Sequence, residues 1–176
     1  MTAPAIERVA AAGLGAALPD FAGLLHACVH DGASVGFVLP FPLDEAAAFW
    51  RDAVLPPLAA GRRRLLAARC GARLAGTVQV LHDMPPNQPH RAELAKLLVH
   101  PAFRRRGIGA ALLAAAEVEA RRLGRSLLTL DTRTGDPAEA LYRSRGWNAV
   151  GSLPGWCRDA LCDRLDATTF MWKDLP

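Results

Sequence analysis

A short stretch rich in arginine and glycine carries the clearest chemical signal in this chain. Between an apolar run and an alanine-rich run stand Arg104, Arg105, Arg106, Gly107, Ile108, Gly109 and Ala110. This order predicts a strand, a glycine-bearing turn and a helix. The first N–H groups of a helix lack intrahelical partners and lie at its positive end, and glycine lets a ligand approach the backbone closely. The stretch therefore indicates a site for a polyanion, most simply a pyrophosphate.

Two other phosphate-binding loops do not match this turn. A Walker loop ends in Gly-Lys-Ser/Thr, which Ile108-Gly109-Ala110 does not supply. A dinucleotide fingerprint needs a third glycine at position 112, which is Leu112. The alternative without a ligand is a glycine-softened helix start beside solvent-exposed arginines.

The spacing Arg104-x-x-Gly107-x-Gly109 after a strand resembles the coenzyme A loop of the GNAT N-acetyltransferases. The resemblance implies that acetyl-CoA is the cosubstrate and that residues 104–110 hold its pyrophosphate. The backbone of the preceding strand would then bind the pantetheine arm as an added strand does. The residues expected to offer these backbone groups, one N–H of which would polarise the thioester, are Leu97, Leu98 and Val99.

Four further segments resemble the tabtoxin-resistance acetyltransferases, which act on a β-lactam amino-acid toxin. In chain order they are residues 30–37, 91–97, 130–132 and 151–157. The resemblance implies a small amine acceptor, zwitterionic or similar to an antibiotic or toxin. Its expected binding residues are Ser34, Val35, Gly36, Phe37 and Trp156. Trp156 replaces a tyrosine of that family, and the nearby Arg158 could pair with an acceptor carboxylate.

Two carboxylates are candidates for the general base that deprotonates the amine. The resemblance matches both Glu93 and Asp131 to carboxylates of the toxin-resistance enzymes. Glu93 also interrupts an apolar strand pattern, and Asp131 ends a strand at the edge where α/β sheets bind ligands. As alternatives, Glu93 would be an edge-strand carboxylate paired with Arg91 or Lys96. Asp131 would bind its own backbone in a turn or cap.

The only tyrosine, Tyr142, falls on the helix predicted after that strand. GNAT enzymes often carry a tyrosine there, and the resemblance implies that Tyr142 protonates the leaving thiolate. A phenol, with an unperturbed pKa of about 10, is close enough to a thiol for this transfer. The alternative is a tyrosine that packs against the tail of the coenzyme.

The remaining pattern predicts an α/β domain over residues 1–176. We expect helices over 21–30 (capped by Asp20), from Asp44 to a weak point near Leu55, over 108–123 and over 138–145. Strands are expected over 5–10, 64–70, 74–81, 92–100, 126–131, 147–150 and 168–172. The last two strands would be joined by a long irregular connection. This order predicts a central mixed, mostly antiparallel sheet with helices on both faces, as in the GNAT fold.

The composition limits the classes of binding partner that we expect. The net charge of +4 favours anionic ligands, but the arginine runs lack interleaved aromatic residues, so we expect no nucleic acid. No apolar run approaches the ~18 residues of a membrane span. The four cysteines and five histidines show no metal-ligand spacing, so we expect free thiols, no metal and a cytoplasmic location. The sequence allows a homodimer without predicting one.

Three functions remain open. The favoured reading is an acetyl-CoA-dependent N-acetyltransferase for a small molecule. A second reading is an acetyltransferase for a protein or peptide amine. The third is a binding module that kept the coenzyme site and lost catalysis, against which the joint presence of Glu93, Asp131 and Tyr142 argues.

Overall fold

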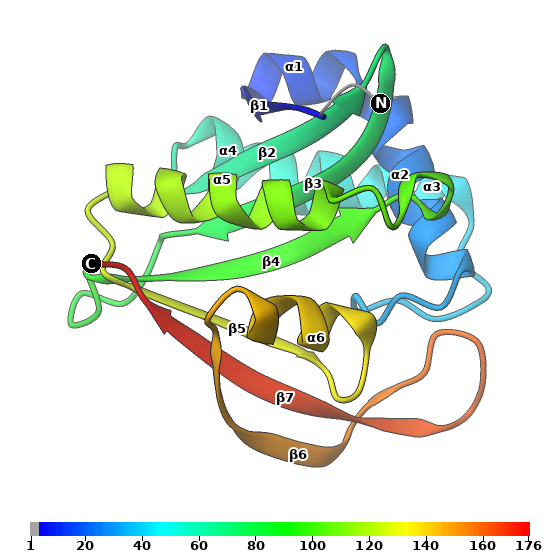
Figure 1. Cartoon of the computed structure of the whole chain (residues 1–176). Helices are drawn as coiled ribbons and strands as arrows, with labels where there is room; N and C mark the ends of the chain where they lie inside the picture. Colours follow the sequence, from blue (N-terminus) through cyan, green and yellow to red (C-terminus); the bar gives the residue numbers. More distant parts are fainter. Residues whose placement is uncertain (1–3) are drawn as a thin grey trace.

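A computed structural model describes residues 4–176, and its seven strands form one sheet in the order β1-β2-β3-β4-β5-β7-β6 (Figure 1). The strands are β1 (Ala5–Val9), β2 (Arg63–Cys70), β3 (Arg73–Leu81), β4 (Arg91–Val99), β5 (Leu127–Arg133), β6 (Asn148–Arg158) and β7 (Leu165–Asp174). Only β4 and β5 are parallel, and all other neighbours are antiparallel. The predicted mixed, mostly antiparallel sheet is confirmed.

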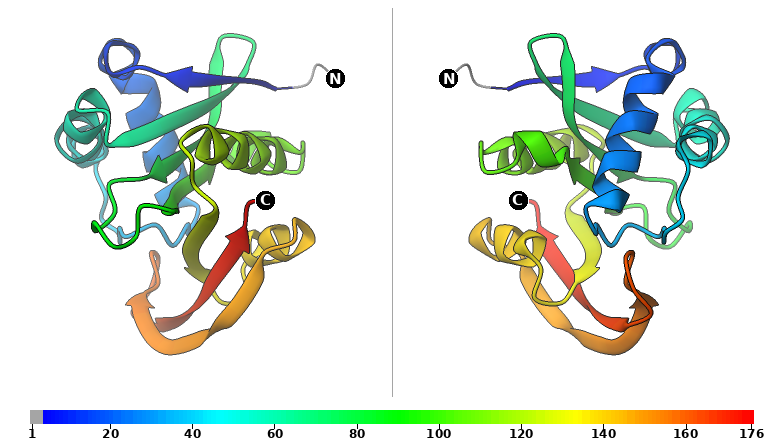
Figure 2. Two further views of the ribbon diagram at one scale, coloured as in Figure 1. Left: turned by 90° about the vertical axis from the view of Figure 1, so that its left-hand side faces the viewer. Right: turned by 90° about the vertical axis from the view of Figure 1, so that its right-hand side faces the viewer.

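Helices cover both faces of this sheet, as predicted (Figure 2). One face carries α1 (Ala11–Ala16), α2 (Leu18–His30), α3 (Leu43–Ala48), the π-helical turn η1 (Phe49–Val54) and α4 (Leu55–Ala59). The other carries α5 (Ile108–Arg122), which follows the short 3-10 turn η2 (Pro101–Phe103), and α6 (Pro137–Ser144). Within residues 4–176, no helix is both long and apolar enough to span a bilayer.

Two hydrophobic cores lie on opposite faces of the sheet, and alternation along β2 divides its residues between them. Leu65 and Ala67 join a core with Phe21 and Trp50 from the first helical layer. Leu66 and Ala68 join the core beneath α5. Because β2 is buried on both faces, it reads as a continuous apolar run rather than an alternating pattern.

The parallel pair β4 and β5 separates after a very short contact. Only Arg91–Glu93 of β4 pair with Leu127–Thr129 of β5. Further along β4 the pairing with β3 shifts register, and Lys96 within this bulge has a φ of 51°. The edge of β4 beyond Glu93 therefore has no β5 partner, and this divergence is visible in Figure 1.

Three helix predictions need correction. The helix expected at Phe21 begins at Leu18, so Asp20 lies in its first turn and Ala17 occupies the N-cap. Pro56 and Pro57 do not end the second helix. They begin α4, whose first turn does not need their missing N–H groups. The helix α1 has no counterpart among the predictions.

The predicted irregular connection before β7 is wrong. β6 continues through Pro154 to Arg158 and forms a long hairpin with β7. A proline is tolerated here because β6 is an edge strand, where one N–H per pair faces away from the sheet. The pairing with β7 shifts register between Leu153 and Cys157, on either side of this proline.

A glycine in β3 sets the distance between the sheet and α5. A Cβ at Gly76 would lie 2.5 Å from the carbonyl oxygen of Leu98 in β4 and 3.0 Å from Cδ1 of Leu112 in α5. Only a residue without a side chain allows this approach. Gly76 therefore fixes α5, and the turn that precedes it, against β4.

We predict that Gly76→Ala destabilises the protein by about 1–3 kcal/mol, because β4 or α5 must move to relieve the overlap. Urea unfolding would measure the change. Gly23→Ala is the matched control, since Gly23 lies inside α2 with nothing within 4 Å of an added Cβ. That change should stabilise by about 0.4–1 kcal/mol. Equal effects of the two substitutions would contradict the packing role of Gly76.

Candidate active site

The turn before α5 has the geometry of an anion site. Gly107 occupies the N-cap with a φ of 76°, and no side chain caps the helix. A Cβ at Gly107 would meet no atom within 4 Å, so the backbone there faces open space. Arg105 also has a positive φ, of 61°. The free N–H groups at the start of α5 thus lie beside an accessible main chain, which suits a pyrophosphate.

The three arginines of this turn do not act alike. Arg104 forms an ion pair with Asp31 at the end of α2. Arg106 donates to the carbonyl of Ala102 at 3.2 Å and lies over the ring of Phe103, 5.3 Å from its centroid. Two of the three side chains therefore hold the turn in place, and Arg105 is exposed.

The β4 segment expected to bind pantetheine lies along the unpaired edge. Leu98 is buried against the first helical layer, and Leu97 and Val99 pack towards the α5 core. The carbonyl oxygen of Val99 accepts from Arg104 Nε at 3.4 Å and lies 3.5 Å from Sγ of Cys28. The side chains are structural, so any ligand contact here comes from the main chain.

The two candidate carboxylates share one face of the sheet at the point where β4 and β5 separate. Glu93 pairs across the strands with Thr129, two residues before Asp131. The Glu93 side chain is 43% exposed and lies 3.7 Å from Arg91, one of the pairings expected if Glu93 had only a structural role. Asp131 accepts a hydrogen bond from Thr168 Oγ1 at 3.0 Å. Both carboxylates remain accessible to a ligand on this face.

Tyr142 lies on the opposite side of β5 in the core beneath α5 and α6. Only 6% of the residue is exposed, and its ring lies 5.6 Å from that of Trp147. Burial raises the pKa of Tyr142 well above its ordinary value, and the nearby charge of Asp131 raises it further. The phenol is therefore held in its protonated form, the form required of a proton donor.

The loop between α2 and α3 is fastened to the tip of the β6–β7 hairpin. Ser34 Oγ lies 3.5 Å from Cys157 Sγ, and the N–H of Leu39 donates to the carbonyl of Ala160 at 2.9 Å. Figure 1 shows these two segments, distant in sequence, side by side at the open end of the sheet. The structure thus brings together the two segments that were predicted to bind the acceptor.

Arg133, which the sequence did not single out, holds this junction. Its guanidinium donates to the carbonyl of Gly32 at 3.1 Å and lies 3.3 Å from Asp159 and 3.4 Å from Asp166. Arg164 bonds the same two carboxylates at 2.6 and 2.7 Å. The acidic residues clustered at the hairpin tip were the only sequence signal for this network.

Aromatic rings border the face that carries the carboxylates. Phe37 packs against Phe49, with ring centroids 5.3 Å apart. On the hairpin side, Trp156 is 50% exposed and contacts Phe170, which pairs with Asp131 across the strands. The predicted acceptor residues Phe37 and Trp156 therefore lie on the two flanks of this face.

Lys96 is a second residue that the sequence did not place in the site. Its half-buried ammonium lies 5.6 Å from the ring centroid of Phe49 and 6.0 Å from that of Phe37. Burial lowers the pKa of Lys96, whereas the charges of Asp131 and Glu93 act in the opposite direction. By contrast, Arg158, the predicted partner of an acceptor carboxylate, is exposed and paired with Asp163 at 2.7 Å.

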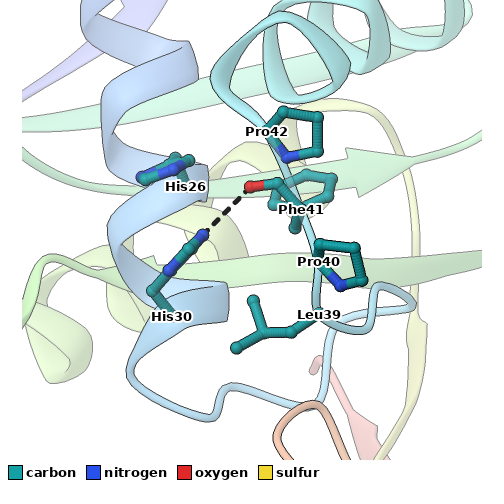
Figure 3. A pocket seen from close by; sticks show the side chains of 6 residues that line it. All are labelled: His26, His30, Leu39, Pro40, Phe41 and Pro42. Atoms are coloured by element: carbon teal, nitrogen blue, oxygen red, sulfur yellow. Dashed lines mark hydrogen bonds between the residues drawn. The ribbon is translucent and has the colours of Figure 1, made fainter.

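A separate surface pocket lies between α2 and the chain around Pro40 (Figure 3). The rings of His26 and His30 stack there with centroids 4.0 Å apart, and His30 Nε2 lies 3.0 Å from the carbonyl oxygen of Phe41. No carboxylate lines this pocket, and its walls are apolar. No residue of the turn at 104–110 or of the β4 edge lines it either, so the pocket is separate from the candidate coenzyme site.

Comparison with known proteins identifies the family. The model of the Acetyltransferase (GNAT) family matches residues 16–147, which include the turn at 104–110 and both carboxylates. The chain belongs to the GNAT family of acetyltransferases. Acetyl-CoA is accordingly its cosubstrate, and residues 104–110 fit the diphosphate because the cradle at Gly107 is open.

One sequence relative is named as an N-acetyltransferase, and two solved structures that share the fold are named for different acceptors. An uncharacterised N-acetyltransferase of Azospirillum brasilense is 29% identical over 155 residues, covering 86% of this chain and 89% of the relative. A ribosomal-protein-alanine N-acetyltransferase from Brucella melitensis has a TM-score of 0.79 at 24% identity, covering 97% and 99% of the two chains. A phosphinothricin acetyltransferase from Sinorhizobium meliloti, solved with acetyl-CoA, has a TM-score of 0.78 at 18% identity, covering 99% and 89%.

We predict that Gly107→Glu weakens acetyl-CoA binding by about 10- to 100-fold, because the added carboxylate would fill the open space beside the free N–H groups and repel the diphosphate. Isothermal titration would measure the affinity. Gly124→Glu is the matched control, since Gly124 lies beyond the other end of α5 with a similar φ of 70° and equally open space. Both variants carry the same strain and charge, so an equal affinity for acetyl-CoA would contradict the pyrophosphate assignment.

Proposed function

We propose that this enzyme moves the acetyl group of acetyl-CoA to the amine of a small zwitterionic acceptor, resembling the substrates of the tabtoxin-resistance enzymes. One domain spanning residues 1–176 would carry both sites. The observation that supports this most directly is the junction at Arg133. It ties the loop between α2 and α3 (residues 31–42) to the β6–β7 hairpin beside the carboxylates, so this acceptor loop would be held in one position against a compact ligand.

In the proposed reaction, Glu93 and Asp131 remove the proton from the attacking amine. Both lie on the face bordered by Phe37 and Trp156, where the acceptor would bind. A carboxylate in this position can act directly or through one water molecule. Glu93 lies on β4 itself, next to the edge that would hold the thioester, and we therefore assign it the principal role and Asp131 a supporting one.

On the coenzyme side, the main chain of Leu97, Leu98 and Val99 would hold the pantetheine arm, and one N–H would polarise the thioester carbonyl. Tyr142 would donate its proton to the departing thiolate. Burial keeps this phenol protonated, so its proton is present when the thiolate departs. In this step the thioester C–S bond breaks and an amide C–N bond forms. The amine loses one proton to the carboxylate, and the CoA thiolate gains one proton from Tyr142.

The second candidate function is acetylation of a protein or peptide amine. The GNAT fold supports it, because one of the similar structures is named for a ribosomal protein's alanine. We favour the small acceptor because Ser34, Gly36 and Phe37 form a short loop held against the hairpin.

An accessible apolar strip on β6, including Val150 and Leu153, would suit a homodimer of either enzyme.

We expect Glu93→Gln to lower turnover by about 10²–10⁴-fold while the affinity for acetyl-CoA stays constant, since the shape is kept and the basicity is lost. Asp131→Asn should have a smaller effect, because an amide oxygen can still accept from Thr168. Steady-state kinetics and titration would separate turnover from binding. The control Asp163→Asn removes an exposed carboxylate of the hairpin tip. Undiminished turnover in Glu93→Gln would assign the base elsewhere.

A direct acceptor assay tests the proposed function. The enzyme would be given acetyl-CoA with amino acids, amino-acid β-lactams, dipeptides, aminoglycosides and lysine-containing peptides, and release of the free CoA thiol would be followed. Small zwitterions should be acetylated best. Strong acetylation of peptides with none of the small zwitterions would favour the protein acetyltransferase. If none of these amines caused release of the CoA thiol, only the reading as a binding module would remain.

A further inference from the structure

A local irregularity of β4 directs Lys96 towards the face of the sheet that carries Glu93 and Asp131, which is the proposed acceptor face. The bulge shifts the register with β3 and gives Lys96 a φ of 51°, in a region that non-glycine residues seldom adopt. Bulges beside active sites commonly re-aim one side chain. Lysine is rare in this chain: of the 21 lysines and arginines, only Lys96 and Lys173 are lysines. A lysine at position 96 is therefore not explained by a high lysine content.

The ammonium of Lys96 has charged neighbours and no direct ionic partner. Its Nζ lies 3.8 Å from the position that a Cβ of Gly36 would occupy, and beside the rings of Phe37 and Phe49. Within residues 4–176, no hydrogen bond or ion pair joins Nζ to a carboxylate at 4 Å or less, although Glu93 and Asp131 are near enough to affect its pKa. A half-buried cation in this state favours an anionic ligand.

The other cations of this face already have partners. Arg63 donates to Gln79 Oε1 at 2.6 Å. Arg91 donates to Gln88 at 2.9 Å and to Thr129 at 2.8 Å, and also lies near Glu93. Within residues 4–176, Lys96 is therefore the cation of this face that has no side-chain hydrogen bond, so all three donors of its ammonium remain available to a substrate.

We propose that Lys96 binds the carboxylate of the acceptor, so that the enzyme selects amines that also carry an acid group. This inference rests on the proposed function and names the residue that would give it specificity. An α-amino acid fits because its carboxylate can face Lys96 while its amine faces Glu93, on the same side of β4. The compact ammonium, with three rotatable donors, can meet carboxylates of differing position. The rings of Phe37 and Phe49 restrict solvent around the pair, which strengthens it.

The test compares each of L-leucine, L-phenylalanine and L-glutamate with its α-carboxamide, as acceptors for the wild type and for Lys96→Met. Methionine keeps the unbranched stem and the same backbone requirement at position 96, and thermal unfolding would verify the fold. We expect KM for the amino acids to rise about 10- to 100-fold, as for a lost charged hydrogen bond, and KM for the amides to change little. Comparing the two enzymes on each acceptor cancels differences in amine basicity.

A binding measurement gives a readout besides turnover. Titration of the three N-acetyl amino acids into the CoA-loaded enzyme should show the same loss in Lys96→Met and no loss for the N-acetyl amides. Arg122→Met, which removes an equal charge from the exposed end of α5, should leave both acceptor classes unchanged. Equal losses for acids and amides, or no loss for either, would overturn the role of Lys96 alone. A wild type that acetylates only peptides would instead overturn the proposed function, and this inference with it.

Discussion

The separation of β4 from β5 is the constraint on which the site depends. Parallel strands need a crossover connection, and here α5 supplies it, with its first turn at the end of β4. The pair holds together over only three residues of each strand, so the edge of β4 from Leu94 onward lacks its usual partner. Unpaired N–H and C=O groups at a strand edge are free to form hydrogen bonds with an added chain or ligand. The same divergence places the turn before α5, the β4 edge and both candidate carboxylates around the opening where the two strands separate.

Electrostatic contacts connect the coenzyme side of this opening with the acceptor side. Arg104, in the turn before α5, pairs with Asp31 at the end of α2. The next residue, Gly32, gives its carbonyl to Arg133, which in turn meets the acidic tip of the hairpin. The first residues of the loop between α2 and α3 are therefore held by the turn before α5 through Arg104 and by Arg133 beside the β6–β7 hairpin. Such a frame can hold a small acceptor in one orientation before the thioester is attacked.

Opposite faces of β5 provide two different environments for the reacting groups. Asp131 lies on the open face beside Thr168, within reach of solvent and substrate. Tyr142 packs in the closed core against Trp147, where burial keeps its phenol neutral. The strand thus separates the proposed proton acceptor from the proposed proton donor. This difference is a property of the layers, because strand alternation and helix packing decide which face is dry.

The fold class, the family and the turn at 104–110 could be predicted from the amino-acid sequence, because these depend on local periodicity and on glycine at fixed spacing. It also singled out Glu93 as a carboxylate within an apolar strand. The continuation of β6 through Pro154 could not be predicted, since an edge position is defined only by the neighbours of a strand. The contacts of Arg133 and the direction of Lys96 likewise depend on tertiary structure. Arg133 contacts Gly32, Asp159 and Asp166, which are 101, 26 and 33 residues away in sequence, and Lys96 lies in a bulge whose register depends on β3.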